Sequence, residues 1–424
     1  MSFPRYPEYK DSGVEWLGKV PGHWGIKRLK HLADIQNGRD YKEVESDEGY
    51  PVIGSGGPFS FASRFIYQGE SVLLGRKGTI DRPLYVNGAF WAVDTMFYTV
   101  IKPRVNAKFL YYCTLTIRFD RYSTSTALPS MTQSDLNNIE FAVPCYEEQC
   151  SITAFLERET TKIDDLMAEQ EKLIALLKEK RQAVIAHAVT KGLDPTVPMK
   201  DSEVEWLGSV PESWGVKRLS SISTKITNGY VGPTRDILLD DGVRYLQSLH
   251  IKKNEIRFNE PYFVSLQWSL DHQKSILQTG DVLIVQTGDI GQVAVVTEEF
   301  EGCNCHALII VSPLRTVILG EWLSWVLNSE YGFHSLLSIQ TGALHPHLNC
   351  GNVKELFIPV PPLEAQAEAV KYLATETSKF DELISTAQSA IDLLKERRTA
   401  LISAAVTGQI DVRGLIKDEQ EQAA

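Results

Sequence analysis

The feature that most constrains the fold is a long internal repeat. Residues 11–21 have the sequence DSGVEWLGKVP and residues 201–211 have DSEVEWLGSVP, an offset of 190 that equals the distance from Trp16 to Trp206. The agreement continues as far as Leu29 and Leu219. A repeat of this length indicates two copies of one structural unit. A chain built this way is suited to a target that also has two parts.

A second repeat closes each unit. Residues 176–181 read LLKEKR and residues 393–398 read LLKERR, an offset of 217, the distance from Lys178 to Lys395. The two units are therefore predicted at about 6–195 and 196–412, and the larger closing offset makes the middle of the second unit longer. Similar frames around different middles indicate one scaffold that presents two different recognition surfaces.

Each closing segment is predicted to be a long helix. Apolar residues recur with a 3.5-residue period from about Glu147 to Ala188, and the pattern returns 217 residues later. About 40 helical residues would make a rod of about 60 Å. The predicted seam residues are Ile152, Leu156, Ile163, Leu166, Leu173 and Leu177 in the first helix and Leu373, Phe380, Leu383, Leu394 and Leu401 in the second.

Because the two seams match in their apolar residues and in their polar interruptions, each helix is the natural partner of the other. We expect an intramolecular antiparallel coiled coil, which would place the two middles at opposite ends. The alternative is that each amphipathic helix packs separately on its own domain. The middles contain short β-prone runs, such as residues 70–75 and 280–285, with a few helices between them, so the predicted class is α+β.

The chemistry-bearing motifs that we searched for do not occur in the sequence. Residues 75–79 (GRKGT) lack P-loop spacing, and there is no Gly-rich cofactor fingerprint, flipped-base loop, nucleophile elbow or metalloprotease His pair. The run Cys303-Asn304-Cys305-His306 has no second ligand pair, so no metal site is predicted. Without a signal peptide or an apolar run that could span a bilayer, a cytoplasmic protein is expected.

The net charge of −11 argues against nucleic acid, but the charge is unevenly distributed. Basic residues outnumber acidic ones in residues 51–140 and 216–274. Loops there offer glycines that let a backbone approach phosphates, and side chains that can reach base edges. An ordinary solvated turn is the alternative for each. The candidate DNA contacts are Ser55, Arg64, Arg76, Lys77 and Thr79 in the first unit and Arg235, Gln247, His250, Lys252, Lys253, Gln286 and Thr287 in the second.

Four tryptophans of the repeated leaders, Trp16, Trp24, Trp206 and Trp214, could be read as base-stacking platforms. Because they belong to the shared frame and have no neighbouring basic cluster, we predict that they pack in the cores.

Taken together, these motifs resemble the DNA-specificity subunits of type I restriction-modification systems. The resemblance covers nearly the whole chain and is carried by the two leaders (11–25 and 201–215) and by the helix entries Val143-Pro144…Glu148-Gln149 and Val360-Pro361-Pro362…Gln366. The second entry departs from the family pattern in having Ala365 before Gln366. The implied domains are a leader with target recognition domain 1 (1–146), a first spacer helix (147–195), a second leader with target recognition domain 2 (196–362), a second spacer helix (363–412) and an acidic tail (413–424).

The resemblance implies a non-catalytic subunit in which each recognition domain reads one half of a bipartite, asymmetric site in double-stranded DNA. It implies docking of two methyltransferase subunits and of restriction subunits, with S-adenosylmethionine, ATP and Mg used by these partners and no cofactor in this chain. Two rival hypotheses remain at this point: a self-contained modification and restriction enzyme, and a coiled-coil scaffold that does not bind DNA.

Overall fold

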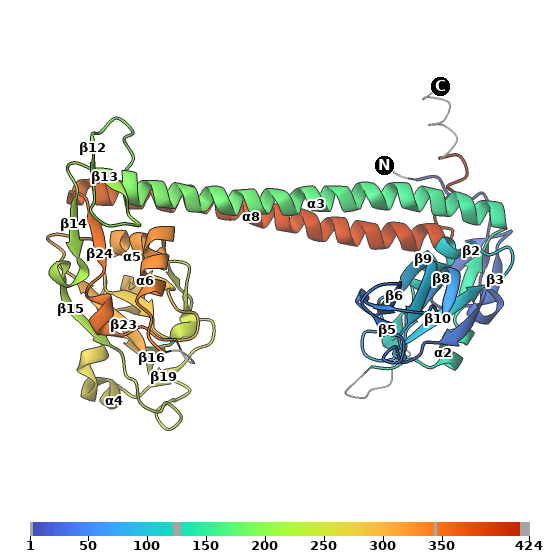
Figure 1. The fold of residues 1–424 in the computed structure, drawn as a ribbon, viewed down its shortest axis with the longest axis horizontal. Coiled ribbons are helices and arrows are strands. Elements are labelled where there is room, and N and C mark those ends of the chain that lie inside the picture. The colour runs from blue at the N-terminus through green and yellow to red at the C-terminus, as the bar shows by residue number, and fades with distance from the viewer. Residues whose placement is uncertain (1–2, 122–128, 343–345, 416–424) are drawn as a thin grey trace. The chain divides into compact units, whose positions relative to one another are not determined.

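The computed structural model describes residues 3–121, 129–342 and 346–415 (Figure 1). Contacts divide the chain into two compact units, unit 1 (Met1–Glu171 with Gln388–Ala424) and unit 2 (Lys172–Ala387). Both dividing points lie inside long helices, α3 (Tyr146–Lys191) and α8 (Leu363–Val406). Each unit therefore combines a globular part, which we call module 1 (described residues of 3–143) or module 2 (described residues of 199–360), with half of each long helix.

Module 1 is built on a mixed sheet. Within its described residues the sheet has the order β4-β10-β8-β9-β6-β7-β5, and the pairing is antiparallel except between β6 and β9. Alternation along β8 places Val72 and Leu74 in the cluster that contains Phe109, and Leu73 in a second cluster with Phe90. The elements are β1 (Tyr9–Asp11), β2 (Lys19–Pro21), β3 (Gly25–Arg28), β4 (Ala33–Asn37), β5 (Glu45–Ser46), β6 (Tyr50–Gly54), β7 (Gly57–Ala62), β8 (Tyr67–Gly75), β9 (Leu84–Ala92), β10 (Met96–Ile101), α1 (Ala107–Thr114), α2 (Gln133–Asn138) and β11 (Glu140–Val143).

Module 2 repeats the central part of that sheet. Its strands β15-β23-β20-β21 follow the same antiparallel order as β4-β10-β8-β9, and the parallel pair β16-β22 of a further sheet, β19-β16-β22, corresponds to the parallel pair β6-β9 of module 1. The two modules thus share a core and differ around it, as the sequence predicted. The elements are β12 (Met199–Asp201), β13 (Ser209–Pro211), β14 (Gly215–Arg218), β15 (Ser223–Asn228), β16 (Val243–Leu246), β17 (Ile251–Lys252), β18 (Glu255–Ile256), β19 (Phe263–Val264), α4 (Leu266–Asp271), β20 (Val282–Val285), β21 (Val293–Val295), β22 (Asn304–Cys305), β23 (Leu308–Pro313), α5 (Gly320–Asn328), α6 (Glu330–Ser338), α7 (Cys350–Val353) and β24 (Phe357–Val360).

The junction between module and helix is also repeated. Gln149 and Gln366 are buried near the starts of α3 and α8. The Gln149 amide donates to the Pro144 carbonyl, and the Gln366 amide donates to the Pro361 carbonyl. Their side-chain oxygens accept from main-chain N–H groups of the modules, at Asn106 and Leu319. A buried amide with both ends bonded fixes each helix entry to its module.

In both units, α3 and α8 pair in an antiparallel coiled coil. In unit 1, Arg398 Nε lies 2.9 Å from Asp164 Oδ1, and in unit 2, Arg181 Nε lies 3.1 Å from Asp381 Oδ1. These ion pairs are equivalent under the 217-residue offset, and the residue numbers of the partners have the same sum in each, as an antiparallel register requires. The predicted intramolecular coiled coil is confirmed, and separate packing of the two helices is excluded.

The predicted seam is wrong at Leu166, Leu173 and Leu383, whose side chains are 44%, 43% and 52% exposed. Their neighbours Met167, Ile174 and Ile384 are the more buried residues. The prediction chose the helix positions that carry more leucines, and at these three places those positions lie one residue before the buried seam. The other predicted seam residues lie inward: Ile152, Leu156, Ile163, Leu373, Phe380 and Leu401 are buried, and Leu177 and Leu394 are half-buried.

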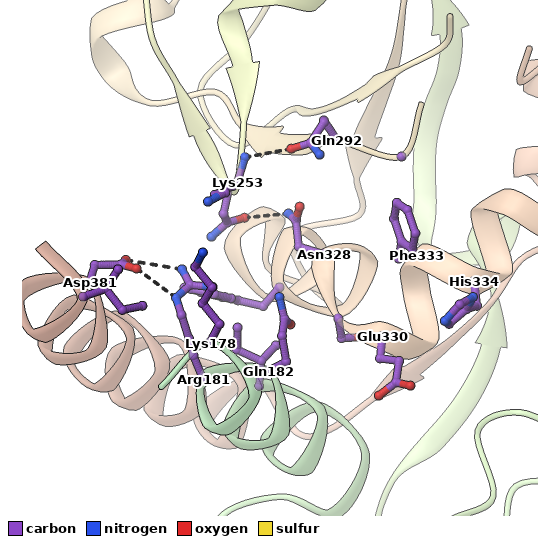
Figure 2. A pocket seen from close by; sticks show the side chains of 16 residues that line it. Lys178, Arg181, Gln182, Lys253, Gln292, Asn328, Glu330, Phe333, His334 and Asp381 are labelled. Atoms are coloured by element: carbon purple, nitrogen blue, oxygen red, sulfur yellow. Dashed lines mark hydrogen bonds and ion pairs between the residues drawn. The ribbon is translucent and has the colours of Figure 1, made fainter. Parts of the chain in front are cut away.

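In unit 2 the paired helices enclose a cavity of about 510 Å³ against α5 and α6 of module 2 (Figure 2). Figure 2 shows Arg181 pointing toward Asp381 at one side of it. Arg181 Nε is buried and has no hydrogen-bond partner within the described residues, but Arg181 Nη2 donates to Asp381 Oδ2 at 3.4 Å, so an ion pair and one long hydrogen bond join the two side chains. Asn328 donates to the Asn254 side chain and to the Val293 carbonyl. This network holds the cavity wall of module 2 in place.

Three of the four leader tryptophans pack inward as predicted. Trp24 and Trp214 are buried, and Trp16 is half-buried with its ring 6.4 Å from that of Phe141. Trp206 contradicts the prediction because 57% of it is exposed. The strand β24 carries Ile358 where β11 carries Phe141, so the second leader lacks the aromatic ring that covers Trp16.

The end of α8 packs closely on the first leader, at Gly408, where φ is +75°. A Cβ there would lie 2.3 Å from Pro21 Cδ and 3.3 Å from Trp24 Cη2. We expect Gly408→Ala to lower the free energy of unfolding by about 1–2 kcal/mol through the left-handed backbone and by about 1–3 kcal/mol more through overpacking. Urea unfolding measures the sum. Gly18→Ala is the control, since Gly18 has φ +60° and open space around its Cβ position; equal losses in both variants would refute the close contact.

Candidate nucleic-acid interface

Module 1 presents an exposed turn directly after the central strand β8. This turn, which we call turn A (Arg76–Thr79), is anchored by the Arg76 N–H donating to the Thr95 carbonyl and by the Met131 N–H donating to the Arg76 carbonyl. Gly78 has φ +83°, and a Cβ there would meet nothing within 4 Å. Arg76 is half-buried, and Lys77 and Thr79 are exposed. No helix follows, in agreement with the rejection of a phosphate-binding P-loop.

The Arg76 side chain is partly oriented by the module. Its Nη1 donates to the Asp94 carbonyl at 3.3 Å, and the guanidinium lies 5.9 Å from the centre of the Phe97 ring. A guanidinium has five N–H donors, so most of them are left for a ligand after this contact. The arrangement suits recognition of an acceptor pair such as guanine O6 and N7.

The β6–β7 hairpin lies next to turn A. Its tip, Ser55-Gly56, lines a cavity of about 460 Å³ together with Phe59, Asp94 and Thr95. Since Thr95 also bonds Arg76, the structure brings the predicted candidates Ser55 and Arg76 to one place. The sequence analysis missed Phe59, which is 57% exposed and packs edge-on against Tyr41 at 5.3 Å. An exposed aromatic beside a glycine turn was the signal available.

Module 2 has an equivalent turn, turn B (Gln286–Asp289), after β20. The Leu348 N–H donates to the Gln286 carbonyl at 3.0 Å, and Gly288 has φ +81°. Gln286 is half-buried and Thr287 is exposed. Lys252 forms an ion pair with Asp289, which brings a cation to the turn. The structure therefore gathers the candidates Gln286, Thr287 and Lys252 at turn B.

Other candidates lie elsewhere or have other partners. Lys253 is exposed with φ +46°, and its N–H donates to the Gln292 side chain. Arg64 lines a different cavity of about 550 Å³ with Arg39 and Phe65. Arg235 is exposed between β15 and β16. Within the described residues, no hydrogen bond or ion pair that we find connects Arg64 or Arg235 with either turn.

His250 was wrongly predicted as a DNA contact, because its side chain is fully buried. Its Nδ1 accepts from the Gln247 N–H at 2.8 Å, and its Nε2 lies 2.8 Å from the Glu260 carbonyl, an arrangement that fixes the neutral tautomer. Packing against the rings of Phe258 and Tyr262 completes its surroundings. Gln247 is half-buried and uses its main chain in the same cap, so its side chain stays a predicted DNA contact.

Burial lowers the pKa of His250 below its ordinary value. The unfolded chain therefore takes up a proton more readily than the folded chain, so the stabilising effect of neutral His250 is present above about pH 6.5 and is lost as pH falls below that value. We expect the stability of module 2 to fall as pH is lowered through the acidic range below about pH 6.5. Urea midpoints across this range would show it, and His250→Gln should flatten the slope; an unchanged slope would mean that His250 does not titrate in this way.

The Cys303-Asn304-Cys305-His306 run is part of a core. Cys303 and Cys305 are buried, and burial raises the pKa of the Cys303 thiol to about 11 and that of Cys305 further. Metal-ligand cysteines need a lowered thiol pKa, so this environment opposes metal binding. Among the described residues, no helix is long and apolar enough to cross a membrane.

Two modules on one scaffold each offer an exposed turn with side chains suited to base edges, an arrangement that suits a protein reading a nucleic-acid target with two parts. The family model described as "Type I restriction modification DNA specificity domain" matches residues 21–176 and 211–392. The chain belongs to this family and carries the domain twice. The resemblance inferred from the leaders and helix entries is thus confirmed.

Relatives that match two thirds or more of the chain agree with this assignment. The type I restriction enzyme EcoBI specificity subunit of Escherichia coli is 22% identical over 98% of this chain and 94% of its own length. The EcoDI specificity subunit of the same species is 21% identical over 96% and 94%. The MjaVIII specificity subunit of Methanocaldococcus jannaschii is 22% identical over 68% and 66%.

Two solved structures show the same fold. A chain from a structure of a type I R-M system aligns with a TM-score of 0.72 at 17% identity and covers 92% of this chain and 100% of its own length. The HsdS subunit from Thermoanaerobacter tengcongensis aligns with a TM-score of 0.53 at 18% identity over 92% and 98%. At these identities the likeness concerns the fold alone.

Proposed function

We propose that this protein is the specificity subunit of a type I restriction-modification complex and that each module reads one half of a bipartite, asymmetric site in double-stranded DNA. The observation that carries the proposal is the repeated turn after the central strand, which has the same backbone anchor in both modules and different side chains. A DNA site with two different halves requires two modules that share a backbone and differ in the side chains that contact the bases.

The partners proposed are two methyltransferase subunits, together with restriction subunits. Two identical methyltransferase subunits would need two similar docking surfaces, and the paired helices carry equivalent residues that could form them. Leu166 and Leu176 of α3 correspond by 217 residues to Leu383 and Leu393 of α8, and all four side chains are 44–65% exposed. Contiguous exposed apolar patches mark interaction sites, so these equivalent leucines are the candidates for two such surfaces. Unit 1 contributes the pair Leu166 and Leu393, and unit 2 contributes Leu176 and Leu383.

In this proposal the chemistry belongs to the partners. S-adenosylmethionine would serve adenine N6 methylation, and ATP with Mg would serve restriction, while this chain supplies sequence selection. The net charge of −11 is compatible with this division, because partners can neutralise much of the phosphate charge while this chain contacts bases. Family membership favours this function over the self-contained enzyme and over the scaffold that does not bind DNA.

The test is reconstitution of the purified chain with its methyltransferase subunit. We expect a complex with two methyltransferase subunits per chain that binds and methylates a split DNA sequence. The chain alone should transfer no methyl group. Methyl transfer by the chain alone would support the enzyme hypothesis, and failure of the full complex to bind DNA would support the scaffold.

A further inference from the structure

Turns A and B occupy the same place in the two modules. Turn A follows β8 and turn B follows β20, and these strands hold the same position in the shared sheet order. In each module the first turn residue accepts a main-chain hydrogen bond, from Met131 in one and from Leu348 in the other, and these donors are 217 residues apart. Arg76 and Gln286 are therefore structural equivalents.

The backbone of the two turns also agrees beyond the anchor. The third residue of each is glycine, with φ +83° at Gly78 and +81° at Gly288, and a Cβ at either would meet nothing within 4 Å. In both turns the first residue is half-buried and the second is exposed. The shared anchor and the shared left-handed glycine give the two turns similar backbones. The turns therefore differ in their side chains, with Arg76, Lys77 and Thr79 in one and Gln286, Thr287 and Asp289 in the other.

We infer that Arg76 and Gln286 are the equivalent base-reading residues of the two modules, Arg76 for a G·C pair and Gln286 for an A·T pair. This inference rests on the proposed function. Arginine pairs with two acceptors, O6 and N7 of guanine, whereas glutamine pairs with N7 and the N6 amino group of adenine. A single difference at one equivalent position would then give the two half-sites different bases.

The surroundings of each side chain fit this assignment. Arg76 is held by the Asp94 carbonyl and the Phe97 ring, which limits its motion and keeps its charge next to exposed Lys77. In module 2, the Gln286 Oε1 atom is covered and has no hydrogen-bond partner within the described residues. A buried acceptor without a donor is unfavourable, so rotation of the amide toward an adenine amino group would replace an unpaired acceptor with a paired one.

Each turn has a lysine beside it that could contact a phosphate but would not select a base. Lys77 follows Arg76 directly, and Lys252 pairs with Asp289 at the end of turn B, so that carboxylate is neutralised where a phosphate would approach. Phosphate contacts of this kind set affinity and not sequence. Sequence selection at this position is then left to Arg76 and Gln286.

The test is selection of bound DNA from a randomised library by the complete complex, carried out for the wild type, for Gln286→Arg and for Arg76→Gln. We expect the wild type to select a split motif. Gln286→Arg should change one position in one half from A·T to G·C, with a change in preference of about 5- to 150-fold, which corresponds to about 1–3 kcal/mol for one good bidentate pair. Arg76→Gln should make the opposite change in the other half.

Alanine variants and a matched control keep the outcomes distinct. Arg76→Ala and Gln286→Ala only remove atoms and should relax the same two positions. Arg315→Gln alters an exposed arginine of module 2 that follows the end of β23 away from turn B, and it should leave the motif unchanged. If the wild type selects a split motif and every variant of Arg76 and Gln286 keeps it, or loses affinity equally for all sequences, the base assignment is wrong while the function stands. If the wild type selects no motif, the function itself fails.

Discussion

Replacing Glu148 by alanine should lower the free energy of unfolding of unit 1 by about 3–5 kcal/mol, because removal of this buried carboxylate would leave its hydrogen-bond donors unpaired. Glu148 is 5% exposed at the start of α3. It accepts from the Tyr6 hydroxyl at 2.7 Å and from Trp24 Nε1 at 3.2 Å, and it lies 2.9 Å from His23 Nε2. One side chain thus ties the first leader to the spacer helix.

Urea unfolding of the full chain measures this loss. Glu147→Ala is the matched control, because Glu147 is the exposed neighbour on the same helical turn and should change stability by less than about 0.5 kcal/mol. Glu148→Gln keeps an acceptor and should lose less than the alanine variant. Similar stabilities for Glu147→Ala and Glu148→Ala would show that the carboxylate does not join leader and helix.

The second large effect concerns partner docking. We expect Leu166→Asp combined with Leu393→Asp in unit 1 to weaken binding of one methyltransferase subunit by at least about 30-fold, since losing two apolar anchors and placing charge in an interface costs about 2–4 kcal/mol or more. The equivalent pair, Leu176→Asp with Leu383→Asp, should remove the other subunit. Native mass spectrometry of the mixture reports the stoichiometry.

These leucines are exposed, so the variants should keep the melting temperature of the wild type. Ile163→Asp, at a buried seam position of α3, is the contrasting variant and should unfold the coiled coil. If both leucine variants still bind two methyltransferase subunits with unchanged affinity, the exposed rows are not the docking surface.

The frame of the protein could be predicted from sequence because it is written twice. A repeat lets each predicted element be checked against its second copy. The 217-residue offset correctly placed the helix entries at Gln149 and Gln366, and it correctly indicated that the two helices pair. The seam phase could not be fixed at Leu166, because adjacent rows of a helix differ by one residue and composition alone favours the row with more leucines. Side-chain burial decides between such rows.

The candidate site was predicted only in part, for a physical reason. Arg76 and Gln286 lie in turns bounded by glycine, which sequence patterns reveal. Histidine in a polar loop gives the same pattern whether it is exposed or caps a turn, so the buried role of His250 could not be seen. Trp206 shows the reverse case, since its exposure depends on Ile358 standing in place of a distant aromatic ring.

Ala365 is now also explained by the structure. It stands where the first helix entry has Glu148, whose carboxylate bonds Tyr6 and Trp24 of the first leader. In module 2 the ring of Trp214 instead packs edge-on against Trp322 at 5.6 Å, and Trp322 Nε1 donates to the Pro359 carbonyl. The same junction is therefore polar in unit 1 and largely aromatic in unit 2.

The most direct measurement is a genome-wide map of adenine methylation in the source cell with and without this gene, with expression of the partner methyltransferase verified. If the protein selects a split site, one motif with two short specific halves around a fixed unread gap disappears on deletion and returns when the gene is restored. Unchanged adenine methylation in cells that express the methyltransferase would contradict the account.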